Sequence, residues 1–378
     1  MNFARTDTGA VAQWWWTIDK WTLAALALLI GLGALLIMAS SPAVAIRIHA
    51  GGAGSVDPQY FVRHYFAELP VALAAMFLVS LQSPKTIRRI ALAVFVVATL
   101  LLAYTLVGGV EIKGARRWIN VPFLASLQPS EFVKPCFAVL CAWLFAQHKL
   151  TPNFPGQWIA ILLFLLIVGL LIKQPDLGMA VVVAAVFFAQ FFLAGLNIVW
   201  IVASLGAAGG ALVGAYYALP HVASRIDRFM DPGSGDSYQV DRAMDAFMNG
   251  GLLGRGPGEG TMKAFLPDAH ADFVFAVAGE ELGLLACLAI VGIFAFVVLR
   301  GFTRLSQENN LFVVLAGTGL FVQFGLQAVI NMASSLHLMP TKGMTLPFIS
   351  YGGSSLLSLG LGMGMALALT RRRFGVEA

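Results

Sequence analysis

The chain returns from a polar loop, at about 219–271, to a long apolar run through Leu266-Pro-Asp-Ala-His-Ala-Asp272-Phe-Val-Phe275. The carboxylate of Asp272 therefore stands at the mouth of this run, and Glu280 and Glu281 follow further along it. Only 11% of the residues are charged. Ionisable side chains within long apolar runs are rare and usually functional, so this stretch contains the first candidate site.

The composition predicts an integral membrane protein. Hydrophobic residues make up 59% of the 378-residue chain, which is outside the range of an ordinary soluble domain. The apolar runs are about twenty residues long, which suits helices that cross a hydrocarbon layer of roughly 30 Å and is too long for barrel strands. We therefore predict an all-α, polytopic membrane protein. The net charge of +5 does not distinguish lipid headgroups from an anionic substrate, and nothing points to nucleic acid.

The hydropathy pattern predicts a single domain, residues 1–378, built as a bundle of ten transmembrane helices with one large loop between helices seven and eight. The first run is expected to remain as a spanning helix rather than a cleaved signal peptide. Around Lys173-Gln-Pro-Asp176, the pattern allows either a tight turn or a broken helix. The predicted spans are 21–42, 65–82, 90–109, 130–148, 157–173, 176–195, 197–218, 272–300, 309–331 and 346–370.

Basic residues predict the orientation. An even number of spans leaves both termini on one side, and the run Arg371-Arg-Arg373 indicates that this side is cytoplasmic, as do basic residues between spans two and three. The large loop then faces outward. Four tryptophans near the first span are expected in the headgroup layer, namely Trp14, Trp15, Trp16 and Trp21.

Positive charge is also expected outside, in the short stretch Gly114-Ala-Arg-Arg-Trp118 between spans three and four. Arg116 and Arg117 favour a site for an anion such as phosphate. An ordinary solvated loop is the alternative. No cysteine spacing suggests a disulfide or zinc site, and the three cysteines are predicted to be small core residues.

The motif Gln128-Pro-Ser-Glu131-Phe-Val-Lys134 opens the fourth span, with Ser130 as a candidate N-cap. Glu131 and Lys134 are three residues apart and therefore share one helical face, where they can neutralise each other. The pair is either functional or a purely structural ion pair near the membrane surface.

Asp272 is the strongest single candidate, although a carboxylate at the first turn of a helix can also be no more than a cap. Glu280 and Glu281 lie deeper and are expected to face a polar interior or to be protonated. The glycine-rich stretch at 249–260 lacks nucleotide-binding spacing, and it predicts a tightly turning loop that lies close to another surface, which could be a substrate or a partner.

The last span opens with Pro340-Thr-Lys-Gly-Met-Thr-Leu-Pro347-Phe-Ile-Ser-Tyr-Gly-Gly-Ser-Ser355. Prolines and a glycine pair predict non-helical backbone, which is tolerated within a membrane only against protein or a water-filled cavity. Lys342 and Ser350 are the substrate-binding candidates in this segment.

Six motifs together resemble the SEDS family of shape, elongation, division and sporulation proteins, and more closely its division branch than its elongation branch. The match covers most of the chain, but Ala271 stands where threonine is common, so this chain lacks a hydroxyl beside Asp272. The motifs are Gly114-Ala-Arg-Arg-Trp-Ile119, Gln128-Pro-Ser-Glu-Phe-Val-Lys134, Gln174-Pro-Asp-Leu-Gly178, Leu266-Pro-Asp-Ala-His-Ala-Asp-Phe273, Gly279-Glu-Glu-Leu-Gly283 and Leu346-Pro-Phe-Ile-Ser-Tyr-Gly-Gly-Ser-Ser355.

The resemblance implies a peptidoglycan glycosyltransferase that polymerises lipid II at the outer face of the cytoplasmic membrane, during septal wall synthesis. It implies that Asp272 is the essential aspartate, with a divalent cation, Mg²⁺ or Mn²⁺, as a possible cofactor bound there. It also implies a class B penicillin-binding protein and other division proteins as partners. The expected substrate-binding residues are Arg116, Arg117, Glu131, Lys134, Lys342 and Ser350. A lipid II flippase or other transporter, and a non-catalytic scaffold, remain as alternatives.

Overall fold

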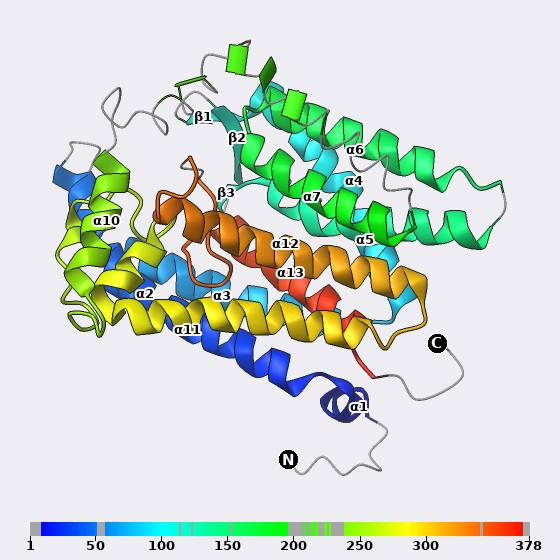
Figure 1. Ribbon diagram of the computed structural model, residues 1–378, viewed down its shortest axis with the longest axis horizontal. Helices are drawn as coiled ribbons and strands as arrows, with labels where there is room; N and C mark the ends of the chain where they lie inside the picture. Colours follow the sequence, from blue (N-terminus) through cyan, green and yellow to red (C-terminus); the bar gives the residue numbers. More distant parts are fainter. Residues whose placement is uncertain are drawn as a thin grey trace.

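The computed structural model describes residues 9–50, 57–112, 115–121, 124–151, 153–195, 238–340 and 343–372, with isolated positions between 206 and 227. Most of these residues form long helices that run side by side (Figure 1). The helices are α1 (Ala10–Thr17), α2 (Lys20–Ala50), α3 (Tyr60–Ser80), α4 (Pro84–Gly108), α5 (Pro129–Leu150), α6 (Gly156–Lys173), α7 (Leu177–Leu193), α10 (Tyr238–Gly250), the short 3₁₀ turn η2 (Met262–Ala264), α11 (Val274–Leu305), α12 (Leu311–Ser335) and α13 (Gly353–Leu369).

The prediction of a polytopic helical bundle is confirmed. Within the described residues, seven helices are long and apolar enough to cross a membrane, and α7 and α13 are shorter apolar helices. These nine correspond to nine of the ten predicted spans. The remaining span, predicted at 197–218, lies largely outside the described residues.

Helix α5 forms the centre of the bundle. It packs against α4, α6, α7, α12 and α13. In its most apolar stretch 89% of the residues are buried, whereas the corresponding value for α6 is 22%. A helix apolar on all sides is buried by its neighbours or by lipid, so α5 is the protein core and α6 presents most of its surface to lipid. Cys136 and Cys141 lie buried and free in α5, as predicted for small core residues.

Helix α1 and the last described residues after α13 lie at the same end of the bundle (Figure 1). Arg371, just after α13, donates to the hydroxyl of Thr17 at the end of α1, at 3.0 Å. The prediction that both termini share one side agrees with this contact. Trp14 packs against protein at this end, because its indole N–H donates to Ser80 at 2.7 Å and the residue is buried, while its predicted place in the headgroup layer stays a prediction. We call this end of the bundle the terminal end and the opposite end the loop end.

A small antiparallel sheet at the loop end was not predicted. It consists of β1 (Val110–Ile112), β2 (Ala115–Val121) and β3 (Leu124–Leu127), in that order. The sequence suggested only a basic loop here. Strands this short lack a clear alternating pattern, so pairing between neighbouring segments, rather than local sequence, defines them.

The glycine-rich loop at 249–260 packs closely onto a surface, as predicted, but that surface is α11 of the same chain and not a substrate or partner. Gly283 interrupts α11 with φ 81° and ψ 178°. The break leaves carbonyls free, and the N–H groups of Arg255 and Gly256 donate to the carbonyls of Glu280 and Glu281 at 3.0 and 2.9 Å. A Cβ atom on Gly254 would lie 2.3 Å from the carbonyl oxygen of Glu281, so this approach requires glycine.

The carboxylates of Glu280 and Glu281 also face this loop. Glu280 accepts hydrogen bonds from the backbone N–H groups of Thr261 and Met262, at 2.9 and 3.0 Å. Glu281 pairs with Lys263 at 2.6 Å. The predicted polar surroundings are therefore supplied by the loop, and these two carboxylates stabilise its fold.

Candidate active site

Two non-helical segments meet at the loop end of the bundle. The aspartate segment, residues 266–273, leads into α11, and the re-entrant segment, residues 343–352, leads into α13. The hydroxyl of Ser350 donates to the carbonyl of Ala271 at 2.5 Å, and the N–H of Tyr351 donates to the carbonyl of His270 at 2.8 Å. The last span was predicted from residue 346, but its helix begins at Gly353, because the preceding backbone is bonded to the aspartate segment instead.

The carboxylate of Asp272 lies against the re-entrant segment. A Cβ atom on Gly343 would stand 3.2 Å from Oδ2 of Asp272, which is closer than most such contacts. Asp272 precedes the N-cap residue of α11, Phe273, and no side-chain capping bond forms at Phe273. Asp272 therefore lies just before α11, and both interpretations of its carboxylate, as a helix cap and as a functional group, stay predictions. The side chain is half-buried, which leaves part of it accessible.

Helix α12 contributes two amides that the sequence analysis did not single out. Asn331 donates to the carbonyl of Asp272 at 3.0 Å and to that of Met344 at 2.6 Å. Gln327 donates to the carbonyl of Thr345 at 3.1 Å. Two amides four residues apart share one helical face, and amides are uncommon in apolar spans, so this spacing was the available signal.

Glu131 and Lys134 form a buried ion pair at 2.9 Å in the first turns of α5. Lys134 also donates to the side-chain oxygen of Gln327 at 3.0 Å. The pair is thus connected, through α12, to the re-entrant segment. Ser130 is not the N-cap, because α5 begins at Pro129 after Gln128, and the hydroxyl of Ser130 is buried without a hydrogen-bond partner in the described chain.

Arg116 and Arg117 do not converge on one anion site. They are neighbours on β2, and successive side chains of a strand point to opposite faces. Arg117 donates to the carbonyls of Gln174 and Pro175. Arg116 is half-exposed and pairs with Glu111 at 3.2 Å.

The segment that Arg117 binds is the tight turn between α6 and α7, one of the two predicted forms. Asp176 accepts a hydrogen bond from the N–H of Met179 at 3.3 Å and so caps α7. Arg117 lies 3.7 Å from the same carboxylate. Both observations support a structural role for this turn.

The N-termini of three helices converge on the loop end. The N–H of Gln128, at the start of α5, donates to the hydroxyl of Ser354 in the first turn of α13 at 2.9 Å. The side chain of Gln128 reaches Asp176, the cap of α7, at 3.5 Å. Helix N-termini carry partial positive charge, so their convergence favours an anion nearby.

The ring of His270, two residues before Asp272, packs against two aromatic rings. Its ring lies 4.4 Å from the ring of Phe61 on α3 and 5.1 Å from that of Tyr351. Burial lowers the pKa of His270 to about 4, while the charge of Asp268 acts in the opposite direction. The imidazole is therefore neutral near pH 7.

No group of three or more potential metal ligands occurs in the described part of the chain. The substrate-binding candidate Lys342 lies outside that part.

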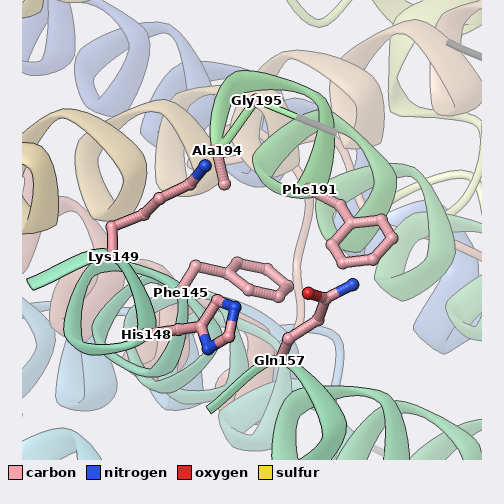
Figure 2. A pocket seen from close by; sticks show the side chains of 7 residues that line it. All are labelled: Phe145, His148, Lys149, Gln157, Phe191, Ala194 and Gly195. Carbon is pink, nitrogen blue, oxygen red and sulfur yellow. The ribbon is translucent and has the colours of Figure 1, made fainter. Parts of the chain in front are cut away.

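A pocket of about 70 Å³ lies at the far end of α5, lined by residues such as His148 and Lys149 (Figure 2). It is at least eleven residues, or roughly 16 Å, along α5 from Lys134, so it is separate from the candidate site.

The fold and site define a polytopic membrane protein whose buried charges and non-helical segments meet at one end of a helical bundle. The family profile described as cell cycle protein, which covers FtsW, RodA and SpoVE, matches residues 20–374. The chain belongs to this family.

Named relatives span nearly the whole chain. The probable peptidoglycan glycosyltransferase FtsW of Caulobacter vibrioides is 45% identical over 373 residues, covering 99% of this chain and 94% of the relative. The probable peptidoglycan glycosyltransferase FtsW of Coxiella burnetii is 34% identical, covering 90% of this chain and 93% of the relative.

Solved structures share the fold. A chain from a peptidoglycan synthase complex, solved to describe the coordination of polymerization and crosslinking, superposes with a TM-score of 0.76 at 27% identity, covering 93% of this chain and 97% of that chain. The rod shape determining protein RodA of Thermus thermophilus gives a TM-score of 0.66 at 27% identity, covering 93% of this chain and 96% of that chain.

Proposed function

We propose that this protein is a peptidoglycan glycosyltransferase that polymerises lipid II into glycan strands during septal wall synthesis. Family membership and the names of the relatives support this activity. The observation that carries the assignment to a site is the half-buried carboxylate of Asp272, held against Gly343 at the loop end of the bundle. A lipid-anchored sugar in the outer leaflet would meet the protein at this depth.

In the proposed reaction, the 4-hydroxyl of one lipid-linked sugar attacks the anomeric carbon of the other. Asp272 accepts the hydroxyl proton as general base while the new C–O bond forms. The bond between the anomeric carbon and the lipid pyrophosphate breaks, and the pyrophosphate leaves with the electron pair. In-line attack converts an α-linked donor into a β-linked product.

The leaving pyrophosphate needs cationic stabilisation more than it needs a proton. The converging N-termini of α5, α7 and α13 would provide it, and Lys134, whose charge is balanced by Glu131 at 2.9 Å, would contribute less directly. Arg117 is already bound to the turn at Gln174 and Pro175, so its contribution is indirect. Arg116, Glu131, Lys342 and Ser350 are the further residues that we propose to shape the substrate site.

A divalent cation, Mg²⁺ or Mn²⁺, fits this site only in part. Asp272 is the carboxylate that would hold it, and the substrate's phosphates would have to supply other ligands, as is common for Mg²⁺. The ion would neutralise charge on the pyrophosphate.

Transport is the less supported alternative. A carrier would be expected to spread its essential charges through to the cytoplasmic side. In the described residues, the buried charged side chains lie at the loop end, apart from Asp19, which pairs with Arg300 at 2.6 Å near the terminal end. This distribution suits chemistry at one membrane surface. A scaffold role would not require Asp272.

The protein is a multi-pass membrane protein, and we propose that it acts at the division septum with both termini in the cytoplasm. The likeness to a chain of a peptidoglycan synthase complex supports a crosslinking partner. A class B penicillin-binding protein and other division proteins are the proposed partners.

Purified protein should polymerise lipid II, with the product sized on a gel, with and without the class B partner and Mg²⁺ or Mn²⁺. Asp272→Asn should abolish the product without loss of thermal stability. Asp268→Asn is the matched control, because it changes a carboxylate four residues away, at a positive φ of 51° that asparagine tolerates. Full activity of Asp272→Asn would remove this residue from the mechanism, and lipid II movement across proteoliposomes without polymer would favour transport.

A further inference from the structure

Asn331 joins the two non-helical segments of the candidate site through a single side chain. The residue is fully buried, and its amide donates to the carbonyl of Asp272 at 3.0 Å and to the carbonyl of Met344 at 2.6 Å. Buried carbonyls outside helices need donors from elsewhere in the fold. One amide therefore fixes the aspartate segment relative to the re-entrant segment.

Gln327 makes the corresponding connection one turn earlier on the same face of α12. Its side-chain oxygen accepts from Lys134 at 3.0 Å, and its amide donates to the carbonyl of Thr345 at 3.1 Å. Four residues of helix correspond to about 6 Å along the axis. Helix α12 therefore bonds to both the Lys134 ammonium group and the Asp272 backbone, and it fixes their positions relative to each other along its axis.

We infer that Asn331 is a positioning residue for the proposed glycosyl transfer, acting through Asp272; the inference rests on the proposed function. A general base must lie within about 2.6–3.2 Å of the proton that it accepts. A displacement of about 1 Å can reduce the rate on the order of 100-fold. Asn331 is enclosed by protein and bonded to backbone, so its contribution falls on the chemical step rather than on lipid II affinity.

Asn331→Leu tests this role, because leucine has a similar size and cannot donate a hydrogen bond. Gln323→Leu is the matched control: Gln323 is a buried amide on the same helix, eight residues earlier, and bonds to neither segment in the described part of the chain. Initial polymerisation rates over a range of lipid II concentrations, together with Tm, are measured for both variants in detergent.

We expect Asn331→Leu to lower kcat by about 10- to 100-fold with KM within about twofold of wild type. Gln323→Leu should keep the wild-type kcat, even if its Tm falls by as much as the Tm of Asn331→Leu. Equal losses of kcat in the two variants at equal Tm, or a raised KM with an unchanged kcat in Asn331→Leu, would overturn the inference.

A second variant covers the case in which Asn331→Leu does not fold. Asn331→Thr keeps one donor and should fold, with kcat roughly 3- to 10-fold below wild type; wild-type kcat in that variant contradicts the role. The proposed function and the positioning role of Asn331 are refuted by different results. Absence of polymer from the wild-type protein refutes the proposed function, whereas an active wild type, an inactive Asp272→Asn and a fully active Asn331→Leu refute only the positioning role.

Discussion

Removing the charge of Lys134 tests how the buried charges at the loop end are held. Its ammonium group lies 2.9 Å from Glu131 and 3.0 Å from the side-chain oxygen of Gln327, and 2% of the side chain is exposed. Lys134→Met keeps the approximate length of the side chain and removes the charge. Glu131 then lacks its cation, and breaking a buried ion pair from one side costs about 3–5 kcal/mol.

We expect Lys134→Met to lower the free energy of unfolding by about 3–5 kcal/mol, because the Glu131 carboxylate stays buried without its cation.

Unfolding by SDS in mixed micelles at pH 7, followed by circular dichroism, measures this loss against the wild type. The double variant Glu131→Gln with Lys134→Met removes both charges and should recover most of the stability at pH 7. A wild-type free energy of unfolding in Lys134→Met, or a double variant as unstable as Lys134→Met, would refute the reasoning. If the pair also serves catalysis, the double variant stays inactive while it is stable.

Two further changes test the neighbours of Asp272. Because burial lowers the pKa of His270 to about 4, the folded protein binds fewer protons than the unfolded chain between pH 6.5 and 4, and stability on the order of 3 kcal/mol is lost as pH falls through this range; His270→Phe should remove this part of the acid sensitivity, measured as Tm against pH. Gly343→Val should lower kcat about 10-fold or more at nearly unchanged Tm, because its side chain displaces the Asp272 carboxylate; a wild-type kcat would show that this contact is unimportant.

Local pattern was enough to predict several features of the candidate site. The apolar runs gave the spans, because a stretch that must cross hydrocarbon carries its signal within about twenty residues. The ion pair of Glu131 and Lys134 follows from a spacing of three residues on one helix, and it forms in the structure at 2.9 Å. Asp272 stood out because a carboxylate at the mouth of an apolar run is costly.

Partners distant in the chain were beyond the reach of such patterns. Lys134 and Gln327 are separated by 193 residues, and Arg117 lies 58 residues before the Pro175 carbonyl that it binds. A helical or strand period reports which side of an element is apolar, but not which other element supplies the donor for a buried carbonyl. Only the packing of the helices decided that Asn331 bridges two segments and that Arg117 binds a turn instead of an anion. The physical reason is that buried polar groups must find partners wherever the tertiary fold places them.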